Sequence, residues 1–197
     1  MFLGGNAMIK NIILASQSPR RRELMLLLNM PFSSENPQIE EVIDPSLSIT
    51  KAIEKIAIDK ALDVFKRHPQ SIVIGSDTVV VLDDQILGKP NDDKDAIRML
   101  KLLSGKTHKV ITGVCILSDK EKIVFNSIAK VSFYPLDEAL IKSYVATSLP
   151  LDKAGAYGIQ DKGALFIKSI EGDYYTIMGL PIAELNRRLK MMEGVNA

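Results

Sequence analysis

The sequence has a single cysteine, Cys115, and only two histidines, His68 and His108. One cysteine cannot form an intrachain disulfide or a cysteine-based zinc site, which is typical of a protein from a reducing compartment. Neither histidine lies in an H-E-x-x-H motif or near Cys115, so zinc chemistry is not expected. We expect Cys115 to be an unreactive residue of a buried strand.

Long hydrophobic runs are also missing. Apolar runs such as "TVVVL", residues 78–82, are far too short to cross a bilayer. The N-terminus contains no continuous apolar segment that ends in a cleavage site, so a secretory signal peptide is not indicated. These absences predict a cytoplasmic protein that does not enter a membrane.

Neither sign of charge dominates the composition. The sequence has 25 lysines and arginines against 24 aspartates and glutamates, a formal net charge of +1. This balance argues against a broad basic surface and therefore against nucleic-acid binding. Any positive charge with a function must be local.

The length sets the domain organisation that we expect. A chain of 197 residues can bury a substantial core. We expect residues 8–197 to form one domain with two lobes. Residues 1–7 match neither the helical nor the strand period and are predicted to be an extension outside this domain.

Apolar spacing predicts helices mixed with strands. Residues 46–69 carry apolar side chains at helical spacing after a cap at Ser48, which predicts an amphipathic helix. Polar residues interrupt the apolar run at Asp77, where we expect a kink or bulge, and residues 171–173 predict a hairpin turn. The other expected elements are strands within 8–15, 71–90, 108–118 and 122–134, and helices from Pro19, within 91–105, within 136–148 and from Leu180.

The order of these elements predicts the fold class. Hairpins alternate with strand–helix units, which favours a mixed sheet over a purely parallel one. We therefore expect an α/β fold with α+β character, in which helices flank a central, twisted, mixed β-sheet.

The stretch "ILASQSPRRRELMLLL", residues 13–28, has the features of a phosphate cradle. A strand would deliver the hydroxyls of Ser16 and Ser18, and a helix that begins at Pro19 would present free N–H groups. Arg20 and Arg21 would add bidentate donors at a helix end that is already positive, which favours an anion there. Alternatively, the arginines project into solvent.

Two charged residues interrupt apolar patterns. Asp77 lies within an apolar run, where a carboxylate needs a metal, a cation or several donors as a partner, unless it bonds its own backbone at a bend. Lys60 lies in the middle of the apolar stripe of its helix and either reaches an anion in a cleft or extends its ammonium to solvent.

Further candidates lie in predicted loops. "LGKP" places Lys89 directly after a strand, and "NPQIEE" supplies Glu40 and Glu41. Acidic pairs are usually solvated, but one of these glutamates together with Asp77 could form an all-oxygen site suited to Mg²⁺ or Mn²⁺. The P-loop, the G-x-G-x-x-G and the G-x-S-x-G patterns are all absent, so the common classes that use them lack support.

Six motifs together resemble the Maf family of nucleoside triphosphate pyrophosphatases. They are "LASQSPRR", "GSDTVV", "LGKP", "LSGKTHKVITGV", "DKAGAYGIQ" and "GDYYTIMGLPI", in the family's order between Ile12 and about Leu185. The resemblance implies a cytoplasmic homodimer with a cleft between two lobes, similar in fold to inosine triphosphate pyrophosphatases. It also implies metal-dependent cleavage between the α- and β-phosphates of a nucleoside triphosphate.

The resemblance assigns roles to individual residues. Asp77 matches the family's catalytic proton acceptor and Glu41 its other essential acid, and we expect this pair to hold the divalent metal. The residues expected to bind phosphate are Ser16, Arg20, Arg21, Lys60 and Lys89.

Three positions resemble the branch of the family that acts on dTTP and UTP: Arg20, Thr78 and Gln160. The Gln160 amide offers a donor and an acceptor, as the pairing edge of such a pyrimidine requires. Modified pyrimidine nucleotides are further candidate substrates. Because members of the family are associated with arrest of septum formation, the alternative is a regulator that binds nucleotide without turning it over.

Overall fold

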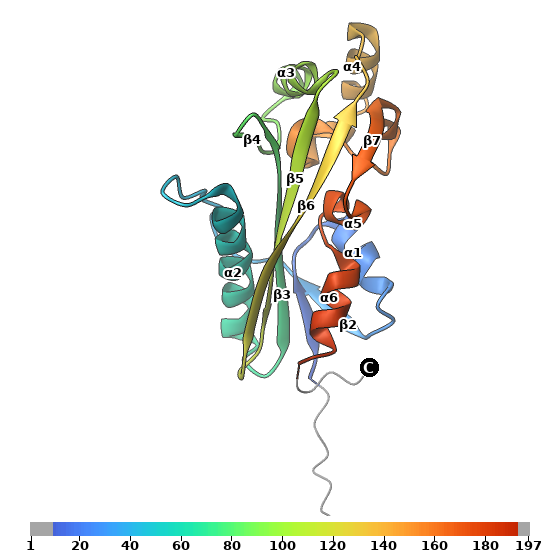
Figure 1. Cartoon of the computed structure of the whole chain (residues 1–197). Coiled ribbons are helices and arrows are strands. Elements are labelled where there is room, and N and C mark those ends of the chain that lie inside the picture. Colours follow the sequence, from blue (N-terminus) through green and yellow to red (C-terminus); the bar gives the residue numbers. More distant parts are fainter. Residues whose placement is uncertain (1–9, 193–197) are drawn as a thin grey trace, which may run out of the picture.

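The computed structural model describes residues 10–192, and the predicted extension 1–7 lies outside them. One seven-stranded sheet forms the centre, with helices on both faces (Figure 1). The strand order is β2-β1-β3-β5-β6-β7, and β4 pairs with β3. The strands are β1 Ile12–Ala15, β2 Phe32–Glu35, β3 Ile72–Leu82, β4 Gln85–Leu87, β5 Thr107–Leu117, β6 Lys122–Phe133 and β7 Ile167–Glu171.

The sheet is mixed, as predicted. β1 runs parallel to β2 and to β3, whereas all the other pairings are antiparallel. The parallel part comes from the N-terminal strand–helix units and the antiparallel part from the long hairpin of β5 and β6.

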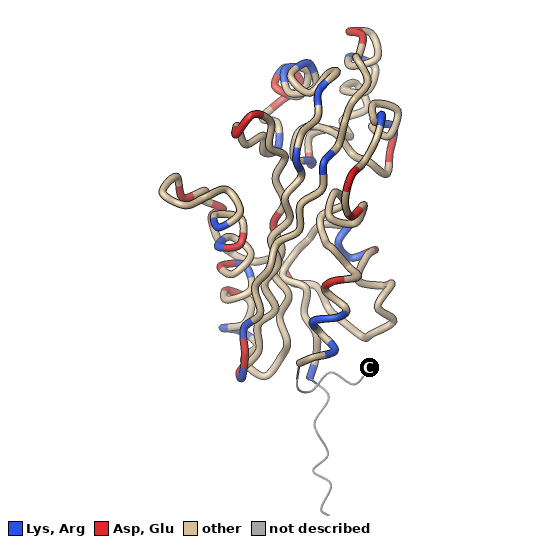
Figure 2. The backbone as a smooth tube through the Cα atoms, in the orientation of Figure 1, with Lys and Arg blue, Asp and Glu red and all other residues tan. Residues whose placement is uncertain are grey.

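The helices largely follow the predicted positions. Ser48 caps α2 by accepting a hydrogen bond from the Lys51 N–H, as its sequence position suggested. No helix within residues 10–192 is long and apolar enough to span a bilayer. Lysines and arginines are interspersed with aspartates and glutamates along these residues (Figure 2). The helices are α1 Pro19–Leu26, α2 Ile49–Arg67, α3 Asp93–Leu103, α4 Glu138–Val145, α5 Tyr174–Met178 and α6 Ile182–Leu189, with 3₁₀ turns at Leu149–Asp152, Ala154–Ala156 and Lys162–Phe166.

Side-chain alternation along β3 divides the core between the two faces of the sheet. Val73 and Val79 lie in the clusters that pack against α2, whereas Ile74 and Val80 lie in clusters on the opposite face. Figure 1 shows α2 on one side of the sheet and α1, α5 and α6 on the other. Consecutive residues of β3 therefore face different helices.

Two glycines bring α2 unusually close to the sheet. A Cβ at Gly75 would lie 2.1 Å from the Ala57 carbonyl oxygen, and one at Gly113 would lie 2.8 Å from the Ile53 carbonyl oxygen. Any larger residue at these positions would push α2 outward. The glycines thus fix the height of α2 above β3 and β5.

The kink or bulge expected at Asp77 is wrong. β3 runs without interruption through this residue, which pairs in register with Gly113 of β5. The small residues Gly75 and Ser76 look like a break in the sequence because they lack apolar bulk. In the structure they are buried strand residues that accommodate close neighbours.

The hairpin expected through residues 171–173 is also wrong. β7 ends at Glu171, and the Asp173 carboxylate then caps α5 by accepting from the N–H groups of Tyr175 and Thr176. The turn therefore leads into a helix, because an aspartate at this position satisfies free helical donors. β2 was not predicted, since only four residues form it and it is not fully buried.

Candidate active site

A cavity of about 620 Å³ opens at a gap in the sheet. On one edge of β3, pairing with β1 stops at Gly75 and pairing with β4 starts at Val80. Among the described strands, none pairs with β3 on this edge over residues 76–79. The carboxyl end of β1 meets the gap, the kind of position at which open α/β sheets bind ligands.

Strand alternation supplies the gap with groups from both faces of the sheet. Asp77 points to the α2 side, where it meets Lys60, and Thr78 points to the opposite side, where it meets Arg21. Both residues line the cavity. Acidic and basic groups that belong to opposite layers of the fold therefore reach the same space.

Lys60 lies between the two predicted acids. Its Nζ is 2.7 Å from Asp77 Oδ1 and 2.8 Å from Glu41 Oε1. The lysine is only 5% exposed, which excludes the alternative of a side chain that extends to solvent. Asp77 is 7% exposed and has the cationic partner that its position in an apolar run required.

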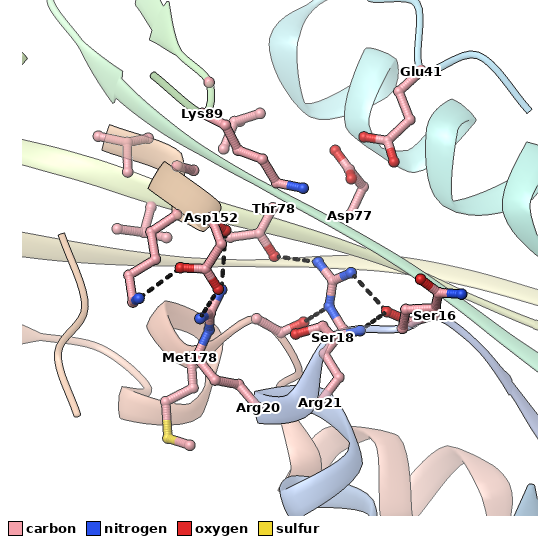
Figure 3. A pocket seen from close by; sticks show the side chains of 18 of the residues that line it. Ser16, Ser18, Arg20, Arg21, Glu41, Asp77, Thr78, Lys89, Asp152 and Met178 are labelled. Carbon is pink, nitrogen blue, oxygen red and sulfur yellow. Dashed lines mark hydrogen bonds and ion pairs between the residues drawn. The ribbon is translucent and has the colours of Figure 1, made fainter. Parts of the chain in front are cut away.

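The surrounding charges keep Glu41 ionised. Partial burial acts to raise the pKa of Glu41, but the hydrogen bond from Lys60 and the charges of Lys60, Lys89 and Arg21 outweigh it. The resulting pKa of Glu41 lies below its ordinary value. Glu41 reaches the site from the loop between β2 and α2 (Figure 3).

Arg21 is held at three of its nitrogens. Its Nε donates to the Gly179 carbonyl oxygen at 2.8 Å, Nη2 donates to Thr78 Oγ1 at 3.0 Å, and Nη1 donates to Ser16 Oγ at 3.4 Å (Figure 3). Burial lowers the pKa of Arg21, and the charges of Asp77 and Glu41 oppose this effect. An arginine remains charged under such conditions. The guanidinium of Arg21, which is predicted to bind phosphate, is therefore held in a fixed orientation.

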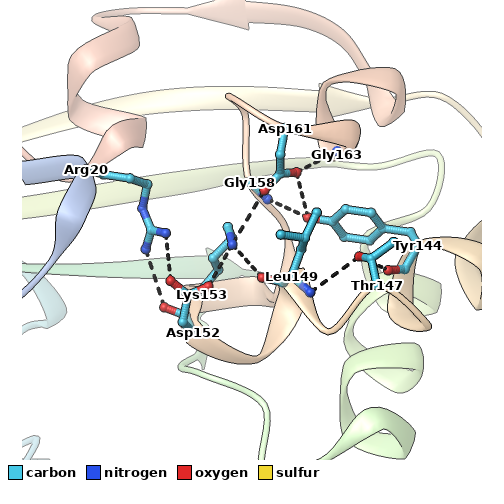
Figure 4. Close-up of polar contacts among 9 residues, drawn as sticks. All are labelled: Arg20, Tyr144, Thr147, Leu149, Asp152, Lys153, Gly158, Asp161 and Gly163. Carbon is cyan, nitrogen blue, oxygen red and sulfur yellow. Dashed lines mark hydrogen bonds and ion pairs between the residues drawn. The ribbon is translucent and has the colours of Figure 1, made fainter. Parts of the chain in front are cut away.

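Arg20 makes a different contact, across the mouth of the cavity. Its Nη1 lies 2.9 Å from Asp152 Oδ2, and Lys153 Nζ lies 2.6 Å from the other carboxylate oxygen of Asp152 (Figure 4). Lys153 also pairs with Asp161 at 3.5 Å. Burial acts to raise the pKa of Asp152, but its bonds to Lys153 and Arg20 bring that pKa below the ordinary value.

The remaining predicted residues also line the cavity. Lys89 follows β4 and points toward Asp77 (Figure 3), and the exposed Gln160 lies in the segment after Lys153. Within residues 10–192 the Gln160 side chain has no hydrogen-bond partner. Ser18 occupies the N-cap position of α1 but does not cap with its hydroxyl; its N–H donates to Ser16 Oγ at 3.2 Å instead.

Cys115 and the two histidines lie outside the lining of the cavity. Cys115 is fully buried in β5, and burial raises the pKa of its thiol to about 12, so it is unreactive at neutral pH. His108 is buried beside Tyr157, and His68 bonds to Glu35. In the described part of the chain, no group of three or more His, Cys, Asp and Glu side chains could hold a metal ion by itself.

The sequence of this protein matches that of a known family. The sequence profile described as Maf-like protein matches residues 11–192, which is nearly the whole chain. This protein belongs to the Maf-like family.

Relatives of this Maf-like protein include two proteins named dTTP/UTP pyrophosphatase. The one from Bacillus cytotoxicus is 49% identical over 185 residues, which are 94% of this chain and 97% of the relative. The one from Bacillus velezensis is 47% identical over 183 residues, 93% of this chain and 97% of the relative.

Among solved structures, a HAM1 protein from Coxiella burnetii resembles this Maf-like protein in fold. The TM-score is 0.53, and the alignment covers 93% of this chain and all of the other at 16% identity. At this identity the similarity supports the fold and not the function.

Sequence reasoning missed several polar residues at the site. Asp152 and Lys153 lie in the motif "DKAGAYGIQ", and Thr112 lies in "LSGKTHKVITGV". Both motifs contributed to the family resemblance, but no chemistry was assigned to these residues. Their partners, Arg20 and Thr78, are too distant in sequence for spacing to predict the contacts.

Proposed function

We propose that this Maf-like protein hydrolyses dTTP and UTP to the nucleoside monophosphate and pyrophosphate. The observation that carries this proposal is the cavity in which the buried Asp77 carboxylate, paired with Lys60, faces the preoriented guanidinium of Arg21. The names of the relatives from the two Bacillus species support the substrate pair. The volume of the cavity suits a ligand the size of a nucleotide.

The basic residues around the cavity would bind the triphosphate. Within residues 10–192, the three contacts of Arg21 leave one N–H on each terminal nitrogen for phosphate oxygens. The Ser16 hydroxyl, Lys89 and Lys60 would add donors and positive charge around the same anion. Neutralising the phosphate charge would supply a large part of the rate enhancement.

Asp77 and Glu41 would orient the attacking water and accept its proton. We assign Asp77 as the acceptor of a proton from a water that attacks one phosphorus in line, with pyrophosphate as the leaving group. The ionised Glu41 would orient this water from the opposite side of Lys60 or share in metal binding. Lys60 would keep both acids at a fixed distance from each other.

The acids also fit a divalent cation. Among the described residues, Asp77 Oδ2 and Glu41 Oε2 have no hydrogen-bond donor, and Mg²⁺ or Mn²⁺ commonly uses one or two carboxylates together with substrate phosphates. Asp77 and Glu41 would hold the ion, which would neutralise charge on the phosphate oxygens.

Base selection is assigned to Arg20, Thr78 and Gln160. The free amide of Gln160 can present a donor and an acceptor to a pyrimidine edge at the cavity rim. Arg20 reaches the same rim through Asp152. The cytoplasmic location, the homodimer and the two-lobed domain remain predictions.

The test is the release of pyrophosphate from dTTP, UTP, CTP, 7-methyl-GTP and ITP, with Mg²⁺ or Mn²⁺ and with a chelator. We expect metal-dependent turnover led by dTTP and UTP, and its near loss in Asp77→Asn. Turnover of wild-type protein no higher than that of Asp77→Asn with every nucleotide would overturn the proposal. Tight nucleotide binding under those conditions would instead indicate a regulator.

A further inference from the structure

Three motifs that are distant in sequence meet in a chain of hydroxyl groups beneath Arg21. Thr78 Oγ1 lies 2.9 Å from Thr112 Oγ1, and Thr112 Oγ1 lies 2.8 Å from the carbonyl oxygen of Thr176. Arg21 Nη2 donates to the other end of the chain, at Thr78 Oγ1. The chain therefore connects a cavity arginine to the backbone of α5.

The direction of each hydrogen bond follows from proton counting. A carbonyl oxygen can only accept, so Thr112 donates its single hydroxyl proton to Thr176. In its contact with Thr78, Thr112 must then accept, and Thr78 must donate. The Thr78 hydroxyl is left with acceptor capacity alone, which is what the Arg21 guanidinium requires.

The inner part of this series of hydrogen bonds is shielded from solvent. Thr112 and Thr176 are both fully buried, so water cannot replace either partner. The Thr176 carbonyl also accepts from the Gly179 N–H at 3.1 Å, and the Gly179 carbonyl accepts from Arg21 Nε. Two of the three contacts of the guanidinium, at Nε and Nη2, thus lead back to the same helix end.

Glycine at position 179 preserves this arrangement. Gly179 has φ of +108°, and a Cβ there would lie 3.3 Å from both Arg21 Nε and Thr78 Oγ1. The backbone can approach the guanidinium closely because no side chain intervenes. The end of α5 is therefore built around the position of Arg21.

We propose that Thr112 is a positioning residue that acts through Thr78 to fix the orientation of Arg21. Thr112 itself touches no substrate, because it lies behind Thr78 as seen from the cavity. The inference also gives Thr78 a role beyond the base selection proposed for it, because its hydroxyl orients the phosphate-binding arginine. This rests on the proposed function, in which Arg21 binds the triphosphate.

Thr112→Val tests the proposal, since valine keeps the shape and removes the hydroxyl. We expect kcat/KM to fall about tenfold, because the Thr78 hydroxyl loses the acceptor of its proton and no longer holds Arg21 in one orientation. The fall should be equal for dTTP and UTP, since Arg21 contacts the part that the two substrates share. Thr112→Ser, which keeps the hydroxyl, should retain most of the wild-type value.

Thr107→Val provides a matched control on the same strand. Thr107 Oγ1 bonds the Ser132 hydroxyl at 2.7 Å on an exposed face, outside the residues that line the cavity. This variant loses a hydroxyl pair of the same kind and should keep the wild-type kcat/KM. All rates are compared at a temperature at which circular dichroism shows each variant to be folded.

A double-mutant cycle separates positioning from a general structural effect. If Thr112 acts through Thr78, Thr78→Val together with Thr112→Val should lose no more activity than Thr78→Val alone. Additive losses, or a Thr112→Val variant as active as wild type, would overturn the inference. If Thr112→Val does not fold, Thr112→Cys replaces it with the same expectations, because a thiol forms only weak hydrogen bonds.

The proposed function and this inference can fail separately. Wild-type protein that releases no pyrophosphate from dTTP or UTP contradicts the proposed function. Active wild-type protein with unchanged Thr112→Val contradicts only the role of Thr112. A change in the ratio of dTTP to UTP turnover in Thr112→Val would also contradict it, since it would place the effect at the base.

Discussion

Lys60 Nζ lies 2.7 Å from Asp77 Oδ1, and both residues are almost completely buried. The lysine belongs to the amphipathic helix α2 and the aspartate to the central strand β3. Their contact joins a helix to the sheet at the cavity, which both residues line. It also gives each buried charge a partner of opposite sign, without which burial would be strongly unfavourable.

Replacing Lys60 should therefore destabilise the fold as well as the site. We expect Lys60→Met to lower the free energy of unfolding by about 3 kcal/mol, because Asp77 is left buried without its cation. Urea denaturation at pH 7 measures this change. Lys55→Met is the matched control, since it removes a lysine of the same helix that pairs with Asp59 at the surface. A change below about 1 kcal/mol is expected there.

The close packing of α2 on β3 makes Gly75 sensitive to any added atom. In Gly75→Ala the new Cβ would meet the Ala57 carbonyl oxygen, so α2 must move and carry Lys60 with it. We expect a loss of about 3 kcal/mol in stability together with reduced turnover. Gly88→Ala is the control for stability, because a Cβ at Gly88 has no neighbour within 4 Å in the described part of the chain. Equal stability of the two variants would contradict this account of the helix position.

Asp152→Asn should change selectivity more than stability. Asp152 and Arg20 form a partly exposed ion pair, which contributes little to folding but fixes Arg20 at the cavity mouth. The buried Lys153, which also pairs with Asp152, keeps Asp161 as a partner in this variant. We expect the preference for UTP over CTP to fall about threefold or more, with the melting temperature nearly unchanged. Glu138→Gln, which breaks an exposed ion pair with Lys142 on α4, should alter neither quantity. If the preference for UTP over CTP is unchanged in Asp152→Asn, Asp152 has no role in base selection.

His108 should make the stability of the protein sensitive to acid. Burial lowers the pKa of His108 from 6.5 to about 4, and among residues 10–192 its Nδ1 has no hydrogen-bond partner. The unfolded chain therefore binds a proton at a higher pH than the folded chain does. The stabilisation is complete above pH 6.5 and is lost as the pH falls toward about 4.

The size of this acid effect can be measured by comparison. A shift of this size corresponds to a loss on the order of 3 kcal/mol when the pH falls from 7 to 4. Urea denaturation at several pH values should show a steeper decline for wild-type protein than for His108→Gln, which has no group that titrates there. Parallel declines for the two proteins would assign the acid sensitivity to other residues.

The sequence by itself determined most of the secondary structure and many of the polar residues that line the cavity. Apolar periodicity was sufficient for α2, because its exposed face leaves a clear pattern. Two apolar runs joined by a polar turn were sufficient for the long strands β5 and β6, although β5 is buried along most of its length. Lys60 and Asp77 were recognisable since each places a charge where the pattern requires an apolar residue. Recognition of Maf-like motifs added Glu41, whose acidic pair resembles an ordinary solvated surface.

Only the tertiary structure decided how these residues meet. The continuity of β3 through Asp77 depends on pairing with β5, and the gap beside residues 76–79 depends on where β1 and β4 end. The contacts of Thr112 with Thr78 and of Asp152 with Arg20 join segments far apart in the chain. Local sequence patterns cannot predict such contacts, because the contacts form only when separate elements pack around a common core.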